Sequence, residues 1–330
     1  MTALTTTASR TRGGPRGLTW TLLRLHTAAV WFWALLVAVA AGCLLWATVA
    51  GGDAAWAAYT SGGCDNGEVD TGCNLNAPAI ELYDTALYLG SAIINVAPLL
   101  VAVWAGAALI GRELENGTAQ LAWTQSVTPS HWLAAKLTLP AGLLTAGTLL
   151  LVQLHRIMWQ AHDSRWKGAG VWQWHESQIF IANGPAAVAH VLLGLAAGVL
   201  IGLLTRRSLA SVGYGFFAMG GLVYALELVR PHLWPAVTAT KQLRDGRPAY
   251  IGMTVEEGGI TPGGARVPDL CMVSTECMPG EDVVGYYREY HPASHFWPLQ
   301  LVETGVVLAV TALLVLASFH LLRRRTGGTS

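Results

Sequence analysis

AAVWFWALLVAVAAGCLLWATVA, residues 28–50, is a run of 23 residues without a charged side chain. An α-helix needs about 20 consecutive apolar residues to cross the hydrocarbon core of a bilayer. The apolar core of a cleaved signal peptide is shorter, about 7 to 15 residues. The run therefore predicts a retained transmembrane helix rather than a removable leader.

Five further apolar runs of similar length follow. They cover residues 86–110, 131–154, 184–204, 209–229 and 300–321. Only 12% of the 330 residues are charged and 53% are hydrophobic, whereas about 25% of the residues in a soluble domain are charged. This composition, in blocks of helix length, predicts an all-α integral membrane protein with six transmembrane helices.

The charged residues divide unevenly between the two sides of this bundle. Residues 1–27, 111–136, 205–208 and 322–330 hold 11 of the 20 basic residues but only two of the 20 acidic ones. Because short cytoplasmic loops are enriched in Lys and Arg, we expect these segments inside the cell, with both termini cytosolic (N-in, C-in). The net charge is zero, and no basic stripe with interleaved aromatic residues is present, so no nucleic-acid partner is expected.

This topology divides the chain into three parts. Residues 1–27 form a cytosolic N-terminus, in which an amphipathic helix would lie on membrane lipid with Trp20 and Arg24 at the interface. The alternative is that this helix is only the frayed start of the first span. Residues 28–322 form the six-helix domain, and residues 323–330 a basic cytosolic tail. The large outer loop between helices 5 and 6, residues 231–298, is expected to fold as a cap containing short helices.

Four of the five cysteines fall in the predicted outer loops. Cys64 and Cys73 lie in the first of these loops and Cys271 and Cys277 in the last, while Cys43 lies in a span. Disulfides form in oxidising exteriors, and four cysteines allow three connectivities. We prefer the local pairs Cys64–Cys73 and Cys271–Cys277, with free thiols as the alternative. The spacings do not match a zinc site, and no metal is expected.

A polar insert separates spans two and three: GRELENGTAQLAWTQSVTPSHW, residues 111–132. Glu113 and Glu115 can begin a short helix, because carboxylates are favoured at a helix N-terminus, and Gly117 marks a turn. Thr128 followed by proline predicts an N-cap at the start of span three. We expect one or two short helices on the cytosolic surface, with both carboxylates exposed as a docking element. The alternative is a solvated loop whose charges only aid solubility.

The pattern Arg-Glu-x-Glu-x-Gly-Thr directly after span two, residues 112–118, resembles the permease subunits of the type-2 ABC exporter family. The resemblance continues in Gln-Ser-Val at 125–127, in the six spans and in the long loop before the last span. YHPAS at 290–294 and FWPLQ at 296–300 resemble permeases common in actinobacteria. The outer loops 155–183 and 231–298 are longer than this family usually has, which leaves the substrate open.

The resemblance implies that residues 111–128 are a coupling helix that inserts into an ABC ATPase subunit. The docking residues would be Arg112, Glu113, Glu115, Gly117, Thr118 and Gln125. The sequence has no GxxxxGK[ST] motif, so we expect no catalytic residue or cofactor in this chain, with ATP and Mg bound by the partner ATPase. The implied function is export of an amphiphilic small molecule, lipid or peptide, with a second permease copy in a homo- or heterodimer, at a bacterial plasma membrane.

Polar residues inside the spans are candidate pathway residues, because they are costly in a bilayer. His190 lies in span four, where a hydrogen bond to a neighbouring backbone carbonyl is its alternative role. Glu227 ends span five, where an i,i+3 ion pair with Arg230 is the alternative. Glu303 begins span six and, together with Glu227, would flank an exit pathway. Lys136 is expected to snorkel to the inner surface.

Histidines on the outer side leave two other functions open. His155, His162 with Asp163, and His175 with Glu176 could serve a membrane enzyme with a metal site on its outer face. No HExxH spacing supports this alternative, which metal analysis of purified protein would detect. A membrane receptor or sensor is the other alternative.

Overall fold

The computed structural model describes residues 24–62, 64, 75–125, 127–166, 172–249, 252–268 and 283–327. Within these residues, six helices are long and apolar enough to cross a membrane. They are Thr27–Ser61, Pro78–Glu115, Pro129–Arg165, Ala186–Thr205, Ser208–His232 and Ala293–Arg325. The prediction of six apolar spans is confirmed.

The first three spans are longer than their apolar runs. The first consists of α2 (Thr27–Trp46), the π-helix η1 (Ala47–Gly51) and α3 (Gly52–Ser61). The second consists of α4 (Pro78–Trp104), the π-helix η2 (Ala105–Gly111) and α5 (Arg112–Glu115), and the third is α7 (Pro129–Arg165). A helix of 37 residues such as α7 is about 55 Å long, well over the ~30 Å of a hydrocarbon core. These helices therefore extend beyond the apolar band.

The remaining helices complete the bundle. They are α6 (Thr118–Thr124), α8 (Ser177–Ala182), α9 (Ala186–Thr205), α10 (Ser208–Val229), the 3₁₀ turns η3 (Arg230–His232) and η6 (Ala293–His295), and α11 (Phe296–Arg325). Of the six spans, α9 is the most buried, and it packs against α4, α7, α10 and α11. It is therefore the central helix of the bundle.

Three glycines one turn apart allow α9 to approach the second span closely. A Cβ atom at Gly194, Gly198 or Gly202 would meet the carbonyl oxygens of Pro98, Ala102 and Gly106, respectively. Small residues repeated every four positions bring helix backbones together in membranes, where dispersion forces replace the hydrophobic effect between helices. The sequence GLAAGVLIG, residues 194–202, thereby fixes the core of the bundle.

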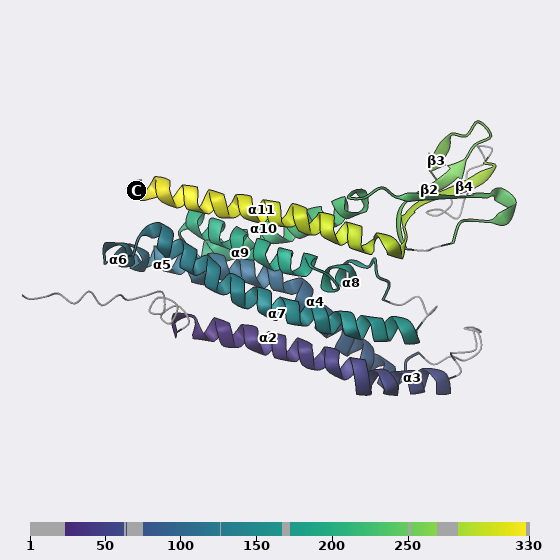
Figure 1. Cartoon of the computed structure of the whole chain (residues 1–330), viewed down its shortest axis with the longest axis horizontal. Helices are drawn as coiled ribbons and strands as arrows, with labels where there is room; N and C mark the ends of the chain where they lie inside the picture. The colour runs from purple at the N-terminus through teal and green to yellow at the C-terminus, as the bar shows by residue number, and fades with distance from the viewer. Residues whose placement is uncertain are drawn as a thin grey trace, which may run out of the picture.

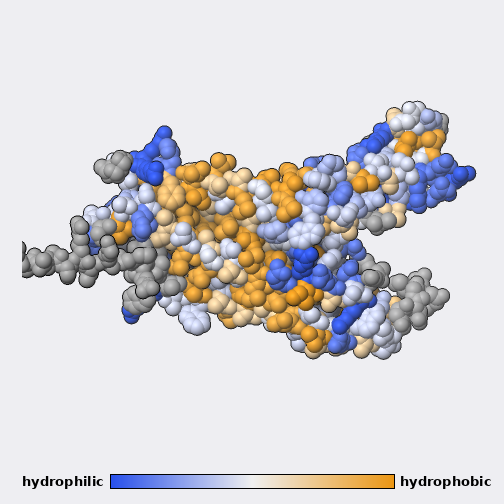
Figure 2. Space-filling view, viewed as in Figure 1, coloured by the Kyte–Doolittle hydropathy of each residue, from blue (hydrophilic) through white to orange (hydrophobic). Residues whose placement is uncertain are grey.

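The two ends of the bundle differ in character (Figure 1). α5, α6 and the C-terminal end of α11 lie together at one end, which we call the arginine-rich end because it includes Arg206, Arg207 and Arg323–Arg325. The strands lie at the other end, which we call the sheet end. Apolar side chains form a broad band over the helices, and polar ones gather towards both ends (Figure 2). The start of α2 and the end of α11 lie at the same end, as an even number of spans requires, while the N-in orientation stays a prediction.

The segment between α10 and α11 contains a four-stranded antiparallel sheet. Its strands are β1 (Val237–Gln242), β2 (Met253–Ile260), β3 (Arg266–Pro268) and β4 (Gly285–His291), in the order β1-β4-β2-β3. The cap expected to contain short helices is built mainly from strands: within the described part of residues 231–298, the helical elements before α11 are the end of η3, η4 (Leu243–Asp245) and η6, all 3₁₀ turns. Alternating Val, Thr and Tyr residues favour strands, as in VTATKQ and GYYREYH. The helical prediction therefore holds for the membrane part only.

Polar contacts within the sheet hold its central strands together. Arg288 is buried and donates to Glu257 Oε2 at 2.6 Å through Nη2 and at 2.8 Å through Nε. The Tyr287 hydroxyl donates to Glu256 Oε1 at 2.9 Å. Burial and this hydrogen bond raise the pKa of the Tyr287 phenol above its ordinary value, so the hydroxyl stays protonated and remains a donor at neutral pH.

Several predicted features lie outside the described residues. Trp20 is one of them, as are Cys73, Cys271 and Cys277. Among the described cysteines, Cys43 is a free thiol, whereas Cys64 is buried and is not free. The pairs Cys64–Cys73 and Cys271–Cys277 therefore stay predictions, as does an interfacial helix formed by Trp20 and Arg24.

Candidate functional site

The polar insert folds into two short helices. α5 continues the second span, Gly117 turns the chain with φ of 72°, and α6 follows. A left-handed φ is readily adopted only by residues without a Cβ, which explains a glycine at this turn. Thr128 accepts a hydrogen bond from the His131 N–H at 3.3 Å, and Pro129 is the first residue of α7. The predicted turn and N-cap are confirmed by this geometry.

Glu113 is anchored in the bundle rather than exposed. Its Oε1 lies 2.6 Å from Lys136 Nζ of α7, and its Oε2 accepts from Trp132 Nε1 at 3.3 Å. Lys136 also donates to the Leu109 carbonyl oxygen at 2.9 Å. Only 1% of the Lys136 side chain and 16% of that of Glu113 are exposed. The expectations that Glu113 is exposed and that Lys136 snorkels to the surface are therefore wrong, because each side chain satisfies the other below the surface.

Glu115 joins the insert to α10. Its Oε2 accepts hydrogen bonds from the backbone N–H of Ser208, at 2.9 Å, and from the Ser208 hydroxyl, at 2.6 Å. Ser208 is the first residue of α10, where unpaired N–H groups and the helix dipole favour an anion. Glu115 is exposed as expected, but its carboxylate is already engaged. The insert is thus fixed to α7 by Glu113 and to α10 by Glu115.

The outer surface of residues 111–125 stays open. Ala119 is fully buried, and Leu114 and Trp123 pack against the apolar core that includes Trp132. The exposed positions are Arg112, Glu115, Asn116, Thr118, Gln120, Leu121, Thr124 and Gln125. Leu121 is 59% exposed, so the insert presents an apolar side chain surrounded by polar ones. The sequence predicts that Leu114, Leu121 and Trp123 face lipid or a partner. Leu121 is exposed in this way, whereas Leu114 and Trp123 pack against the core of the bundle.

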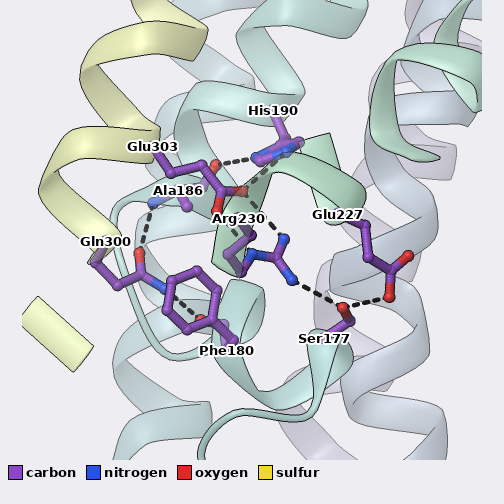
Figure 3. A network of polar contacts seen from close by, with 8 residues as sticks. All are labelled: Ser177, Phe180, Ala186, His190, Glu227, Arg230, Gln300 and Glu303. Atoms are coloured by element: carbon purple, nitrogen blue, oxygen red, sulfur yellow. Dashed lines mark hydrogen bonds and ion pairs between the residues drawn. The ribbon is translucent and has the colours of Figure 1, made fainter. Parts of the chain in front are cut away.

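A second polar cluster joins η3, α8 and α9 to the start of α11 (Figure 3). The start of α11 is its end nearer the strands (Figure 1). Arg230 of η3 donates to Glu303 of α11 through Nε at 2.7 Å and Nη2 at 3.1 Å. Arg230 Nη1 also donates to Ser177 Oγ of α8 at 2.8 Å, and the Ser177 hydroxyl donates to Glu227 Oε1 at 2.5 Å. The carboxylate of Glu303 is fully buried. The alternative i,i+3 pair between Glu227 and Arg230 is therefore wrong, because the guanidinium turns inward to a carboxylate 73 residues away.

His190 and Gln300 complete this cluster. His190 Nδ1 lies 2.7 Å from the Ala186 carbonyl oxygen, and its Nε2 lies 3.6 Å from Glu303 Oε1. Because a carbonyl only accepts, Nδ1 carries a hydrogen, and the backbone bond expected as the alternative for His190 is present. The Gln300 amide accepts from Ala186 N–H at 3.2 Å and donates to the Phe180 carbonyl. The roles of Ser177 and Gln300 were not recognised from the sequence, in which Ser177 stands in the polar stretch HESQ, residues 175–178, and Gln300 ends FWPLQ, residues 296–300.

The three candidate pathway residues meet in this cluster in different ways. His190 and Glu227 line a cavity of about 190 Å³ between α4, α8, α9 and α10, together with Asn95, Ser177 and Arg230. His190 Nε2 has no hydrogen-bond partner among the described residues. Glu303, whose side chain is 0% exposed, instead forms an ion pair with Arg230. The structure thus brings His190, Glu227 and Glu303 together but gives Glu303 a bridging position between helices.

The other histidines do not converge. His155 is fully buried, with Nε2 2.8 Å from Ser91 Oγ and Nδ1 2.7 Å from Asn183 Oδ1. His162 Nδ1 lies 2.9 Å from the Tyr83 hydroxyl. Within the described residues, no group of three or more His, Cys, Asp or Glu side chains could hold a metal ion. Burial lowers the pKa of His175, and the charge of Glu176 offsets only part of this shift. These histidines therefore link neighbouring helices through polar contacts.

Taken together, six apolar helices and a polar insert anchored to two of them define a multi-pass membrane protein. The family model described as ABC-2 membrane transporter related matches residues 33–230. The chain belongs to this family of ABC-2 type permeases, which form the membrane subunits of ABC transporters and partner in general with an ATPase subunit. No curated protein and no solved structure matches the chain significantly. The match ends at Arg230, so the sheet and α11 lie beyond it.

Proposed function

We propose that this chain is the membrane subunit of an ATP-driven exporter and that residues 111–128 are its coupling helix. The observation that carries this proposal is the double anchoring of the insert, by Glu113 to Lys136 of α7 and by Glu115 to Ser208 of α10. A loop that only aids solubility needs no such contacts. A displacement of α5 by a partner would be passed to two different spans.

The docking surface is the exposed face of the insert. Arg112, Thr118 and Gln125 remain available for an ATPase subunit, and exposed Leu121 supplies an apolar anchor. Anchors of this kind dominate the energy of an interface when polar residues surround them. Glu113, partly buried, positions this surface from behind, and exposed Glu115 holds it to α10. Gly117 sets the angle between the two helices.

Transport would follow from ATP and Mg bound by the partner. Closure of two ATPase subunits would move two copies of the insert and switch the pathway between two permease copies, as a rigid-body rearrangement. The substrate class is an amphiphile: a small molecule, a lipid or a peptide. The membrane is the bacterial plasma membrane, with the arginine-rich end in the cytosol, since short arginine-rich loops favour that side.

Co-purification tests the coupling assignment. The full-length chain would be expressed with the ATPase encoded beside it, extracted in mild detergent, and examined for co-elution. Leu121→Asp places a charge at the centre of the proposed surface and is expected to lose the ATPase. Leu243→Asp is the matched control, because Leu243 is an exposed leucine, 49% accessible, at the opposite end of the molecule. Co-elution that is equal for wild type and Leu121→Asp would overturn the assignment.

Glu113→Arg is not a clean test of docking. Its new cation would face the buried Lys136 ammonium, which lies 2.6 Å from Glu113 Oε1 in the wild type, so a lost complex could follow from local misfolding as well as from a lost contact. The sequence alone, with Glu113 expected on the surface, predicts that Glu113→Arg keeps its fold and loses the ATPase. The ion pair with Lys136 predicts instead a destabilised variant, because removing one partner of a buried ion pair is strongly destabilising.

A further inference from the structure

A large apolar groove lies between the first three spans at the arginine-rich end. Its volume is about 490 Å³, and it is lined by α2, by α4 with η2, and by α7. Its walls include Phe32, Leu100 and Leu143, all of which stay substantially exposed. The groove therefore opens on the outer surface of the bundle, where a membrane protein meets lipid. Its size and apolar lining are those of a small-molecule site.

The depth of the groove corresponds to one leaflet. Along the start of the first span its lining residues run from Leu25 to Leu36, which at 1.5 Å per residue is about 17 Å. The hydrocarbon core of a bilayer is about 30 Å thick, so one leaflet contributes about half of that depth. A ligand that fills the groove would thus have an apolar part as long as one leaflet is deep.

Basic side chains stand at the polar end of the groove. Arg112 lines it, is exposed, and has no ion-pair partner among the residues that the structure describes. Lys136 lines it too, with two of its three N–H donors used by Glu113 and the Leu109 carbonyl. Because Glu113 balances only one of these two cations, the mouth carries a net positive charge.

His26 adds a polar group without adding charge. Burial and the charge of Lys136 lower the pKa of His26, so its ring is neutral at neutral pH. Its Nε2 is buried without a hydrogen-bond partner in the described part of the chain, beside Trp104 at a ring distance of 5.8 Å. Of these three groups, the exposed Arg112 guanidinium can meet a ligand directly, whereas the Lys136 ammonium, 1% exposed, and the buried His26 Nε2 lie behind it.

We propose that this groove binds a phospholipid of the leaflet at the arginine-rich end, with one acyl chain between α2, α4 and α7 and its phosphate at Arg112. Basic pockets between transmembrane helices recognise anionic lipid headgroups, and a guanidinium matches the geometry of a phosphate. The bound headgroup lies beside the Lys136–Glu113 pair that anchors the insert. Occupancy of the groove therefore stabilises the position of α5.

Lipid retention tests the site on the permease chain alone, so failure of the proposed ATPase docking would not affect the result. Full-length protein in mild detergent is equilibrated with equal amounts of phosphatidylglycerol and phosphatidylcholine, and the retained lipids are measured by mass spectrometry. Both lipids offer a phosphate to Arg112, but phosphatidylcholine adds a quaternary ammonium that the net positive charge of the mouth disfavours. Wild type is therefore expected to retain phosphatidylglycerol several-fold in preference. Arg112→Gln is expected to lose this preference. Arg323→Gln, which removes the same charge at the same end but outside the groove, should keep it.

Filling the groove tests the acyl-chain site. Ala108→Phe places a ring in the groove from the second span, and Ala29→Phe does so from α2. Either variant, if it elutes as wild type does, should retain several-fold less phosphatidylglycerol. Retention that is unchanged in the well-folded variant would overturn the proposal and favour another occupant, such as the transported substrate or a second copy of the chain. Equal retention of both lipids by wild type would overturn headgroup recognition.

Discussion

Lys136 of α7 and Glu113 of α5 form an ion pair whose atoms lie 2.6 Å apart and whose lysine side chain is only 1% exposed. The pair joins the segment between spans two and three to the third span at a depth where water does not screen it. Together with the bond from Ser208 to Glu115, it turns a polar insert of the sequence into a rigid part of the bundle.

Removing one member of this pair should destabilise the protein strongly. Lys136→Met leaves Glu113 partly buried without its cation, and breaking a buried pair costs about 3–5 kcal/mol. The double variant Lys136→Met with Glu113→Gln removes both charges and should recover most of that loss. Thermal unfolding of the purified chain in detergent measures both effects. If the double variant is no more stable than Lys136→Met, the ion pair is not what fixes α5.

The turn at Gly117 should tolerate asparagine better than alanine. Its φ of 72° lies in the left-handed region, which costs a residue with a Cβ roughly 1–2 kcal/mol, while asparagine visits it more readily. Gly117→Ala is therefore expected to change the angle between α5 and α6 and to weaken co-purification with the ATPase, whereas Gly117→Asn keeps most of it. Gly305→Ala, at a helical glycine with open space around its Cβ position, is the control for a general effect of adding a methyl group. An equal response to Ala and Asn at position 117 would contradict this account.

Arg230 should depend on Glu303 and not on its neighbour Glu227. Arg230→Gln leaves a carboxylate at 0% exposure without its cation, and a loss of about 3–5 kcal/mol in unfolding free energy is expected. Arg230→Lys should restore little, because a single ammonium cannot replace a fork that donates from Nε and Nη2 at once. Thermal unfolding of the variants in detergent measures each loss.

Glu227→Gln is the matched control for that experiment. Glu227 is exposed and accepts only from Ser177 in the cluster, so its neutralisation should cost about 1 kcal/mol or less. If Glu227→Gln is as destabilising as Arg230→Gln, the i,i+3 pair of Glu227 with Arg230 would contribute more to stability than the contact of Arg230 with Glu303.

The sequence is sufficient to predict the membrane part of the fold for a physical reason. In lipid, a run such as residues 28–50 has to satisfy its backbone N–H and C=O groups by hydrogen bonds within a helix. Its length and apolarity alone therefore predict a span. The same applies to Thr128-Pro129, where the chemistry of the cap is local. Such features need no knowledge of distant residues.

The partners of the charged residues could not be predicted in this way. Spacing along one helix indicated Glu227 for Arg230 and the membrane surface for Lys136, whereas the observed partners lie 73 and 23 residues away. Such groups meet only through the packing of different helices, α5 against α7 and η3 against α11. The sheet between α10 and α11 was missed although VTATKQ and GYYREYH are rich in residues that favour strands, because a loop beside membrane helices was expected to be helical.

The glycines of α9 provide the sharpest test of that packing. Gly198→Ala would place a methyl group against the Ala102 carbonyl oxygen and the Ala105 side chain, and overpacking of this kind costs about 1–3 kcal/mol. Gly142→Ala, in the middle of α7, meets nothing within 4 Å and should be neutral or stabilising by up to about 1 kcal/mol, because alanine is the better helix former. Thermal unfolding in detergent compares the two variants directly. Equal stability of both would mean that α9 and the second span are not in close backbone contact. A selective loss at position 198 would establish the contact on which the buried positions of His190 and Glu303 also depend.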